Sequence, residues 1–228
     1  MEELATTTAQ SSALDIATLV ENTLIEEKKT VLSLASDTLV LSVGKKVKES
    51  SIEAASDVIK VLCDDMKKKY KNLGEQYLGI FVTDSVGKLY TGEFASGQEY
   101  KGSDVSSRDY FQEAKKTKKA AIGDVVKSKT TGELFSVICA PILDYSGEFL
   151  GIFGMPIKAT ALTDLVSKKK FGETGFAFMI NSVAIVIAHP KNDFILSLDF
   201  SKTKGLEEIG KNMVQGKSGV ISYELDGI

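Results

Sequence analysis

The chain has few of the residues that enzymes and metalloproteins use for chemistry. Its 228 residues include one histidine, two cysteines, three prolines and no tryptophan. The lone histidine has no second histidine to share a metal or to build a nucleophile–base pair. Cys63 and Cys139 have neither zinc-type nor Cys-x-x-Cys spacing. We expect buried free thiols, with a disulfide as the alternative. The sequence therefore predicts no enzymatic activity, no bound metal and no cofactor.

Excess positive charge and long apolar runs are missing as well. The formal net charge is -3, which gives none of the electrostatic footprint of a nucleic-acid-binding protein. No apolar run approaches the length of a membrane span, and no signal peptide opens the chain. The hydrophobic content of 43% is that of a globular protein with a real core.

The first 72 residues form a helical segment. They contain no proline and one glycine, Gly44. Farther along, Ala54, Val58, Leu62 and Met66 follow one another at intervals of four, which is the spacing of one helix face. We expect a helix of more than 40 residues, bent near Gly44, with two helices as the alternative.

The composition changes at residue 74. Residues 77–93 predict a strand, a tight turn at 84–87 and a second strand. A short helix at about 106–114 and two strands around 146–147 complete an antiparallel sheet of about five strands with a helix inserted in it. A further helix is expected from residue 159.

A second copy of this pattern follows. Residues 176–190 align with 78–92 and place a second turn at 181–183, with His189 at the end of a strand. A helix at 205–215 and a strand at 219–225 follow in the same order. The repeat indicates a duplicated α+β module. We expect a helical segment at 1–72, a first module at 73–160 and a second, shortened module at 161–228.

Two stretches carry a family resemblance. The run SSRDYFQEAKKTKKAAIGDVVKSKTTGELFSVICAPILDYSGEFLGIFGMPI, at 106–157, resembles the membrane-distal module of double Cache sensor domains of bacterial methyl-accepting chemotaxis proteins. FGETGFAFMINSVAIVIAHP, at 171–190, resembles the start of their proximal module. The resemblance implies an α+β fold in which a long N-terminal helix packs on two tandem PAS-like (Cache) antiparallel-sheet modules. It also implies the extracytoplasmic part of a membrane-anchored receptor, homodimeric through the long helix.

Arg108 is the one arginine among 28 basic residues. Ser106 and Asp109 have capping-box spacing, which would place Arg108 in the first turn of a helix, where the dipole disfavours a cation. An anion held by the planar guanidinium fork would compensate, and lysine lacks that fork. An internal salt bridge or stacking interaction is the alternative.

The resemblance implies which residues bind the ligand. In the family this arginine meets a ligand carboxylate, and aromatic residues at the places of Tyr110 and Phe111 contact the ligand, with core packing as their alternative. Amino-acid-binding members carry an ammonium-binding aspartate where this chain has Pro156, so we expect a carboxylate-bearing ligand without an α-amino group. The remaining candidate contacts are Asp124, Val126, Cys139 and Met155.

Three functions remain open at this stage. The first is a chemotaxis receptor domain that binds a small molecule in the distal module and signals across the membrane. The second is the ectodomain of a sensor histidine kinase or of a cyclic-dinucleotide enzyme. The third is a structural ectodomain without a ligand, which predicts a filled distal pocket.

Overall fold

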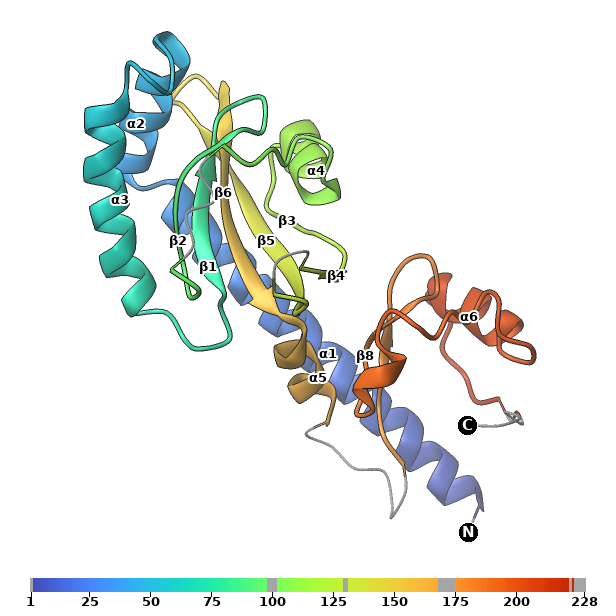
Figure 1. The fold of residues 1–228 in the computed structure, drawn as a ribbon. Coiled ribbons are helices and arrows are strands. Elements are labelled where there is room, and N and C mark those ends of the chain that lie inside the picture. The colour runs from blue at the N-terminus through green and yellow to red at the C-terminus, as the bar shows by residue number, and fades with distance from the viewer. Residues whose placement is uncertain (1, 98–101, 129–130, 168–174, 222, 224–228) are drawn as a thin grey trace. The chain divides into compact units, whose positions relative to one another are not determined.

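The computed structural model describes residues 2–97, 102–128, 131–167, 175–221 and 223. The chain divides into two compact units, one formed by Leu24–Lys158 and the other by Met1–Thr23 together with Ala159–Ile228. The fold is α+β, with a long N-terminal helix and antiparallel sheets, as predicted (Figure 1). In the described part of the chain, none of the helices combines the length and apolar character needed to span a bilayer.

The helical segment is broken into three helices, so the prediction of one helix longer than 40 residues is wrong. They are α1 (Glu2–Ala35), α2 (Thr38–Glu49) and α3 (Ser56–Lys71). The first break falls before Asp37, whose carboxylate accepts a hydrogen bond from the Leu39 backbone N–H at 2.8 Å and so starts a new helix. Gly44 does not bend the chain. It lies buried inside α2, facing Leu150 of the sheet.

Asp37 connects the break between α1 and α2 to helix α3, and substituting Asp37 tests how much this connection stabilises the fold. Its Oδ2 accepts a hydrogen bond from Lys69 Nζ at 2.8 Å. Burial raises the pKa of Asp37, but hydrogen bonds from Lys69 and from the Leu39 N–H outweigh it, so that the pKa lies below the ordinary 3.8. We expect Asp37→Ala to lower the free energy of unfolding by about 1–2 kcal/mol at neutral pH.

The lowered pKa of Asp37 also determines how the stability loss in Asp37→Ala depends on pH. A carboxyl whose pKa is lower in the folded state contributes stability above its unfolded pKa and loses it as the pH falls through the folded value. The difference between wild type and Asp37→Ala should therefore begin to shrink near pH 3.8 and be smaller still below it. Denaturant unfolding at several pH values measures this, and a difference that stays constant with pH would show that the charge of Asp37 contributes nothing.

The unit formed by residues 24–158 is built on one antiparallel sheet. Its strand order is β2-β1-β6-β5-β3, and β4 also pairs with β5. The strands are β1 (Gly79–Thr83), β2 (Leu89–Phe94), β3 (Ala121–Ile122), β4 (Val126–Lys127), β5 (Leu134–Leu143) and β6 (Phe149–Lys158). The sheet has six strands, one more than expected, because residues 123–125 interrupt the segment between β3 and β4. There the Asp124 N–H donates to Asp109 Oδ2 at 2.6 Å instead of to a neighbouring strand.

The two faces of this sheet pack against different helices. Helix α4 (Asp109–Thr117) covers one face, where Phe111 and Ala114 join a core with Phe81, Cys139 and Ile152. Helices α2 and α3 lie on the other side of the sheet (Figure 1), where Leu150 and Ile142 approach Gly44. Both faces of the central strands are therefore buried, and the cavity described below opens on the α4 side.

The unit that contains residues 159–221 carries a smaller hairpin. It consists of β7 (Met179–Ile180) and β8 (Val186–Ala188), with α5 (Ala159–Ser167), the 3-10 turn η1 (Asn192–Phe194) and α6 (Glu207–Val214). The predicted helices from 159 and at 205–215 are confirmed. The strand expected at 219–225 falls partly outside the described residues, and 219–221 form no strand.

The two hairpins predicted to be repeats use the same turn chemistry. Asp84 Oδ1 accepts hydrogen bonds from the N–H groups of residues 86 and 88, at 3.0 and 2.8 Å. Asn181 Oδ1 accepts from residues 183 and 185, at 3.1 and 2.9 Å. These are side-chain turns that close on the backbone two and four residues ahead. Asp84 and Asn181 therefore hold equivalent places in the two turns.

Candidate functional site

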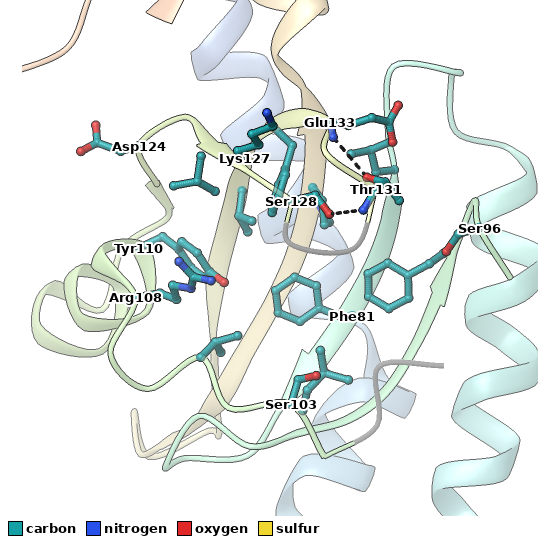
Figure 2. A pocket seen from close by; sticks show the side chains of 18 of the residues that line it. Phe81, Ser96, Ser103, Arg108, Tyr110, Asp124, Lys127, Ser128, Thr131 and Glu133 are labelled. Carbon is teal, nitrogen blue, oxygen red and sulfur yellow. Dashed lines mark hydrogen bonds between the residues drawn. The ribbon is translucent and has the colours of Figure 1, made fainter. Parts of the chain in front are cut away.

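A cavity of about 450 Å³ lies on the α4 side of the sheet, within the unit formed by residues 24–158. This volume is in the ordinary range for small-molecule pockets. Its wall combines an apolar part from the strands with polar groups from the start of α4 and from the segment around β4 (Figure 2). The predicted site residues in the wall are Arg108, Tyr110, Asp124, Val126 and Pro156.

Arg108 stands at the N-cap of α4, and the predicted capping box is absent. No side chain caps the helix. Ser106 donates its N–H to Asp104 Oδ1 at 2.7 Å, and the Asp109 carboxylate accepts from the Asp124 N–H. Both residues of the proposed box are thus engaged elsewhere. Arg108 keeps an extended backbone, with φ -75° and ψ 141°, one residue before the helix begins.

The Arg108 guanidinium has no partner in the described part of the chain. The side chain is exposed and lines the cavity, and among the described residues it forms neither an ion pair nor a hydrogen bond. The internal salt bridge considered as the alternative is therefore not formed by those residues. A guanidinium carries five donors in a fixed fork, which suits a planar anion such as a carboxylate.

Tyr110 lies next to Arg108 and is almost completely buried, with 7% of its surface exposed. Burial raises the pKa of its phenol, and the nearby Arg108 charge offsets this only in part. The hydroxyl therefore keeps its proton at physiological pH and can donate a hydrogen bond. Figure 2 shows Tyr110 and Arg108 together at one wall of the cavity.

The carboxylates of the cavity wall are mostly committed to the protein itself. Hydrogen bonds from Ser106 lower the pKa of Asp104, and Asp109 holds the Asp124 N–H. The exposed Asp124 side chain points away from the middle of the cavity in Figure 2. Glu133 also lines the cavity, on the side opposite Arg108 in Figure 2, so the described residues direct no carboxylate at a ligand on the Arg108 side.

The other three predicted contacts do not line the cavity. Phe111 is 1% exposed and packs edge-on against Phe149, with ring centroids 5.9 Å apart. Cys139 is fully buried, its thiol donates to the Tyr110 carbonyl, and burial raises its pKa to about 12. Met155 sits opposite Ile138 on β5. Successive strand residues point to opposite faces, so β6 places Pro156 at the cavity and Met155 on the other face.

Sequence reasoning missed the aromatic part of the wall. Phe81, Phe94 and Phe135 line the cavity. Strand β1 is buried at all five positions, so the sequence shows no alternation that would tell which side Phe81 faces. Gly154 was a usable signal. A Cβ there would lie 2.2 Å from the Phe81 ring, so this glycine marks the place where an aromatic side chain crosses the strand.

His189 and the cysteines show no catalytic arrangement. His189 follows β8, accepts a hydrogen bond from the Lys191 N–H at Nδ1, and is surrounded by the rings of Phe176, Phe178 and Phe194. Burial lowers its pKa. Both cysteines are free. Within the described ranges, no three histidine, cysteine, aspartate or glutamate side chains are grouped so that they could hold a metal ion.

Comparisons with known proteins agree with the fold. A family model described as a Cache domain matches residues 1–228. The methyl-accepting chemotaxis protein McpC of Bacillus subtilis (strain 168) is 27% identical over 119 residues, which are 49% of this chain and 18% of that protein. The chain therefore spans less than a fifth of this curated relative.

Two solved structures show the same fold at low sequence identity. The ligand-binding domain of the Pseudomonas aeruginosa PAO1 amino acid chemoreceptor PctB, in complex with L-Arg, is 17% identical, covers 93% of this chain and 74% of its own, and has a TM-score of 0.60. The sensor domain of the V. cholerae histidine kinase DctB is 13% identical, with coverage of 85% and 69% and a TM-score of 0.66. The resemblance inferred from residues 106–157 and 171–190 is confirmed.

Proposed function

The chain belongs to the Cache domain family, and on that premise we propose that it is the extracytoplasmic ligand-binding domain of a chemotaxis receptor. In this proposal a small carboxylate-bearing molecule binds in the cavity on the α4 side of the sheet. Binding favours one of two states of the packed unit, and the long helix α1 carries the difference toward the membrane. The intact receptor is membrane-anchored and homodimeric through that helix.

One observation supports the carboxylate ligand above the others. Arg108, the one arginine of the chain, lines the cavity without a partner among the described residues, beside a Tyr110 hydroxyl that stays protonated. A charge-assisted bidentate contact between a guanidinium and a carboxylate is among the strongest polar interactions in proteins.

The wall also favours a ligand without an α-amino group. Pro156 is where amino-acid-binding relatives of this kind carry an aspartate, and proline offers neither a charge nor an N–H. Asp104 and Asp109 are held by backbone N–H groups, and Asp124 points away. An ammonium next to the bound carboxylate would have to share Asp104 or Asp109 with the backbone N–H groups that they already accept, so we expect it to regain only part of its lost hydration.

We expect a carboxylic acid to bind about 10- to 100-fold more tightly than the α-amino acid with the same side chain, since a buried ionised donor with incomplete hydrogen bonding costs roughly that much. A thermal-shift screen finds the first ligands, because a compound at 100 times its Kd stabilises the folded state by about 2.7 kcal/mol. Calorimetry on matched pairs then measures the ratio. Tighter binding of the amino acids would contradict the interpretation that Pro156 disfavours a ligand with an α-amino group.

The alternative functions share this fold but differ in the signalling domain that the ligand-binding domain controls. An ectodomain of a sensor histidine kinase or of a cyclic-dinucleotide enzyme would bind its ligand in the same way, and the similarity to the DctB sensor domain is consistent with it. The sequence of the full-length gene would identify its output domain and so distinguish a chemotaxis receptor from a histidine kinase or a cyclic-dinucleotide enzyme. A structural ectodomain predicts a filled pocket, and the cavity of about 450 Å³ argues against it.

A further inference from the structure

The apolar part of the cavity wall is rich in aromatic side chains. The rings of Phe81 and Phe94 are inclined by 13° to each other, with centroids 6.3 Å apart. Phe135 and the Pro156 ring belong to the same wall. In Figure 2 the Phe81 ring lies to the right of Arg108 and Tyr110, near the middle of the view. The wall therefore presents aromatic surface, mainly from the half-buried Phe94 and Phe135 and to a small extent from Phe81, which is 3% exposed, next to a group of hydrogen-bond donors.

Two glycines make room for these rings against the strands. A Cβ at Gly154 would lie 2.2 Å from the Phe81 ring. A Cβ at Gly92 would lie 2.9 Å from the Phe94 ring and 3.0 Å from the Phe81 Cβ. The two rings thus lie directly on the backbone of β2 and β6. A surface fixed in this way keeps its shape when a ligand binds, which lowers the entropic cost of binding.

The geometry points to an arylalkanoic acid as the ligand: a planar aromatic ring joined by a short chain to a carboxylate, without an α-amino group. This inference rests on the proposed function, because Arg108 and Tyr110 hold the carboxylate. It adds that the aromatic wall of Phe81 and Phe94 receives the body of the ligand. Aromatic rings gain from offset or edge contacts with one another beyond the area that they bury.

Aliphatic acids and dicarboxylic acids fit this wall less well. A saturated ring or chain buries a similar area but has no ring quadrupole to match those of Phe81 and Phe94, a difference of about 2- to 10-fold in affinity. A second carboxylate would leave the phenylalanine rings for the exposed edge of the cavity, where Lys127 and the hydroxyl of Thr131 lie. Lysine offers a point charge without the planar fork of Arg108, so it repays less of the cost of desolvating that carboxylate.

The test is calorimetry on the 228-residue chain with a panel of matched probes. 3-Phenylpropionate is compared with 3-cyclohexylpropionate, hexanoate, adipate, phenylalanine and 3-phenylpropanol. We expect 3-phenylpropionate to bind most tightly and 3-cyclohexylpropionate about 2- to 10-fold more weakly. Phe94→Leu should remove most of the difference between those two probes. Val86→Ala, at an exposed position outside the cavity wall, should leave it unchanged.

The panel separates failure of this inference from failure of the proposed function. If hexanoate or adipate binds more tightly than 3-phenylpropionate, and the binding weakens in Arg108→Gln, the aromatic ligand is refuted and the carboxylate site stands. If 3-phenylpropanol binds as tightly as 3-phenylpropionate, or if no carboxylate binds, both are refuted. Equal affinity for the phenyl and cyclohexyl acids refutes the role of the rings alone.

Discussion

Replacing Arg108 with alanine should lower the affinity for the tightest-binding carboxylate of the panel by about 30- to 1,000-fold, which corresponds to the loss of a charge-assisted bidentate contact of about 2–4 kcal/mol. The guanidinium is exposed and has no partner in the described part of the chain. Its removal breaks no internal ion pair formed by those residues. The unfolding temperature without ligand should therefore change little.

Arg108→Lys tests the shape of the cation as well as its charge. Lysine supplies a point charge without the planar fork, so we expect it to recover only part of the lost affinity. Lys127→Ala is the matched control, since it removes another cation from the same cavity wall at an exposed position. Unchanged affinity in Arg108→Ala, measured by calorimetry, would return this arginine to a structural role. Equal losses in the two alanine variants would indicate a general electrostatic effect.

Replacing Phe111 with alanine should destabilise the fold by about 3–5 kcal/mol, the usual cost of removing a fully buried aromatic side chain. Phe111 is 1% exposed, and its ring meets that of Phe149 edge-on. It lies outside the cavity wall, so the affinity of the folded protein should stay within about twofold of wild type. Denaturant unfolding measures the first quantity, and calorimetry at low temperature measures the second.

Two further variants make this result interpretable. Phe111→Leu keeps much of the apolar volume and should fold even if the alanine variant does not. Tyr145→Ala removes an aromatic side chain that is 96% exposed, and we expect a change within about 0.5 kcal/mol. A large drop in affinity for Phe111→Leu, without a matching loss of stability, would mean that this side chain reaches the ligand after all.

Local signals predicted the local structure well. The turns at Asp84 and Asn181 are closed by side chains that bond the backbone two and four residues ahead. All the atoms involved are neighbours in sequence, and the residue type therefore carries the information. The helices at 109–117 and 207–214 also follow from their spacing of apolar residues.

Signals that depend on distant residues were misread. The capping box at Ser106 and Asp109 has the right spacing, but Asp109 bonds to Asp124, 15 positions away, and the box does not form. The break before Asp37 involves Lys69, which lies 32 positions later in the sequence. Asp109, which could cap its own helix, is held by another segment, whereas Asp37 caps α2 and is also held by Lys69 of α3.

The sequence by itself determined the α+β class and the repeated hairpin, and it singled out Arg108 as a candidate ligand contact, because these depend on residue type and short-range spacing. The tertiary structure alone decided which residues share a surface. Strands β1 and β6 are buried on both faces, so their sequences do not distinguish the cavity side from the core side. Once the sheet forms, its two-residue period places Pro156 at the cavity and Met155 on the opposite face. Packing of α4 then buries Phe111 and leaves Arg108 at the cavity wall without an internal partner in the described chain.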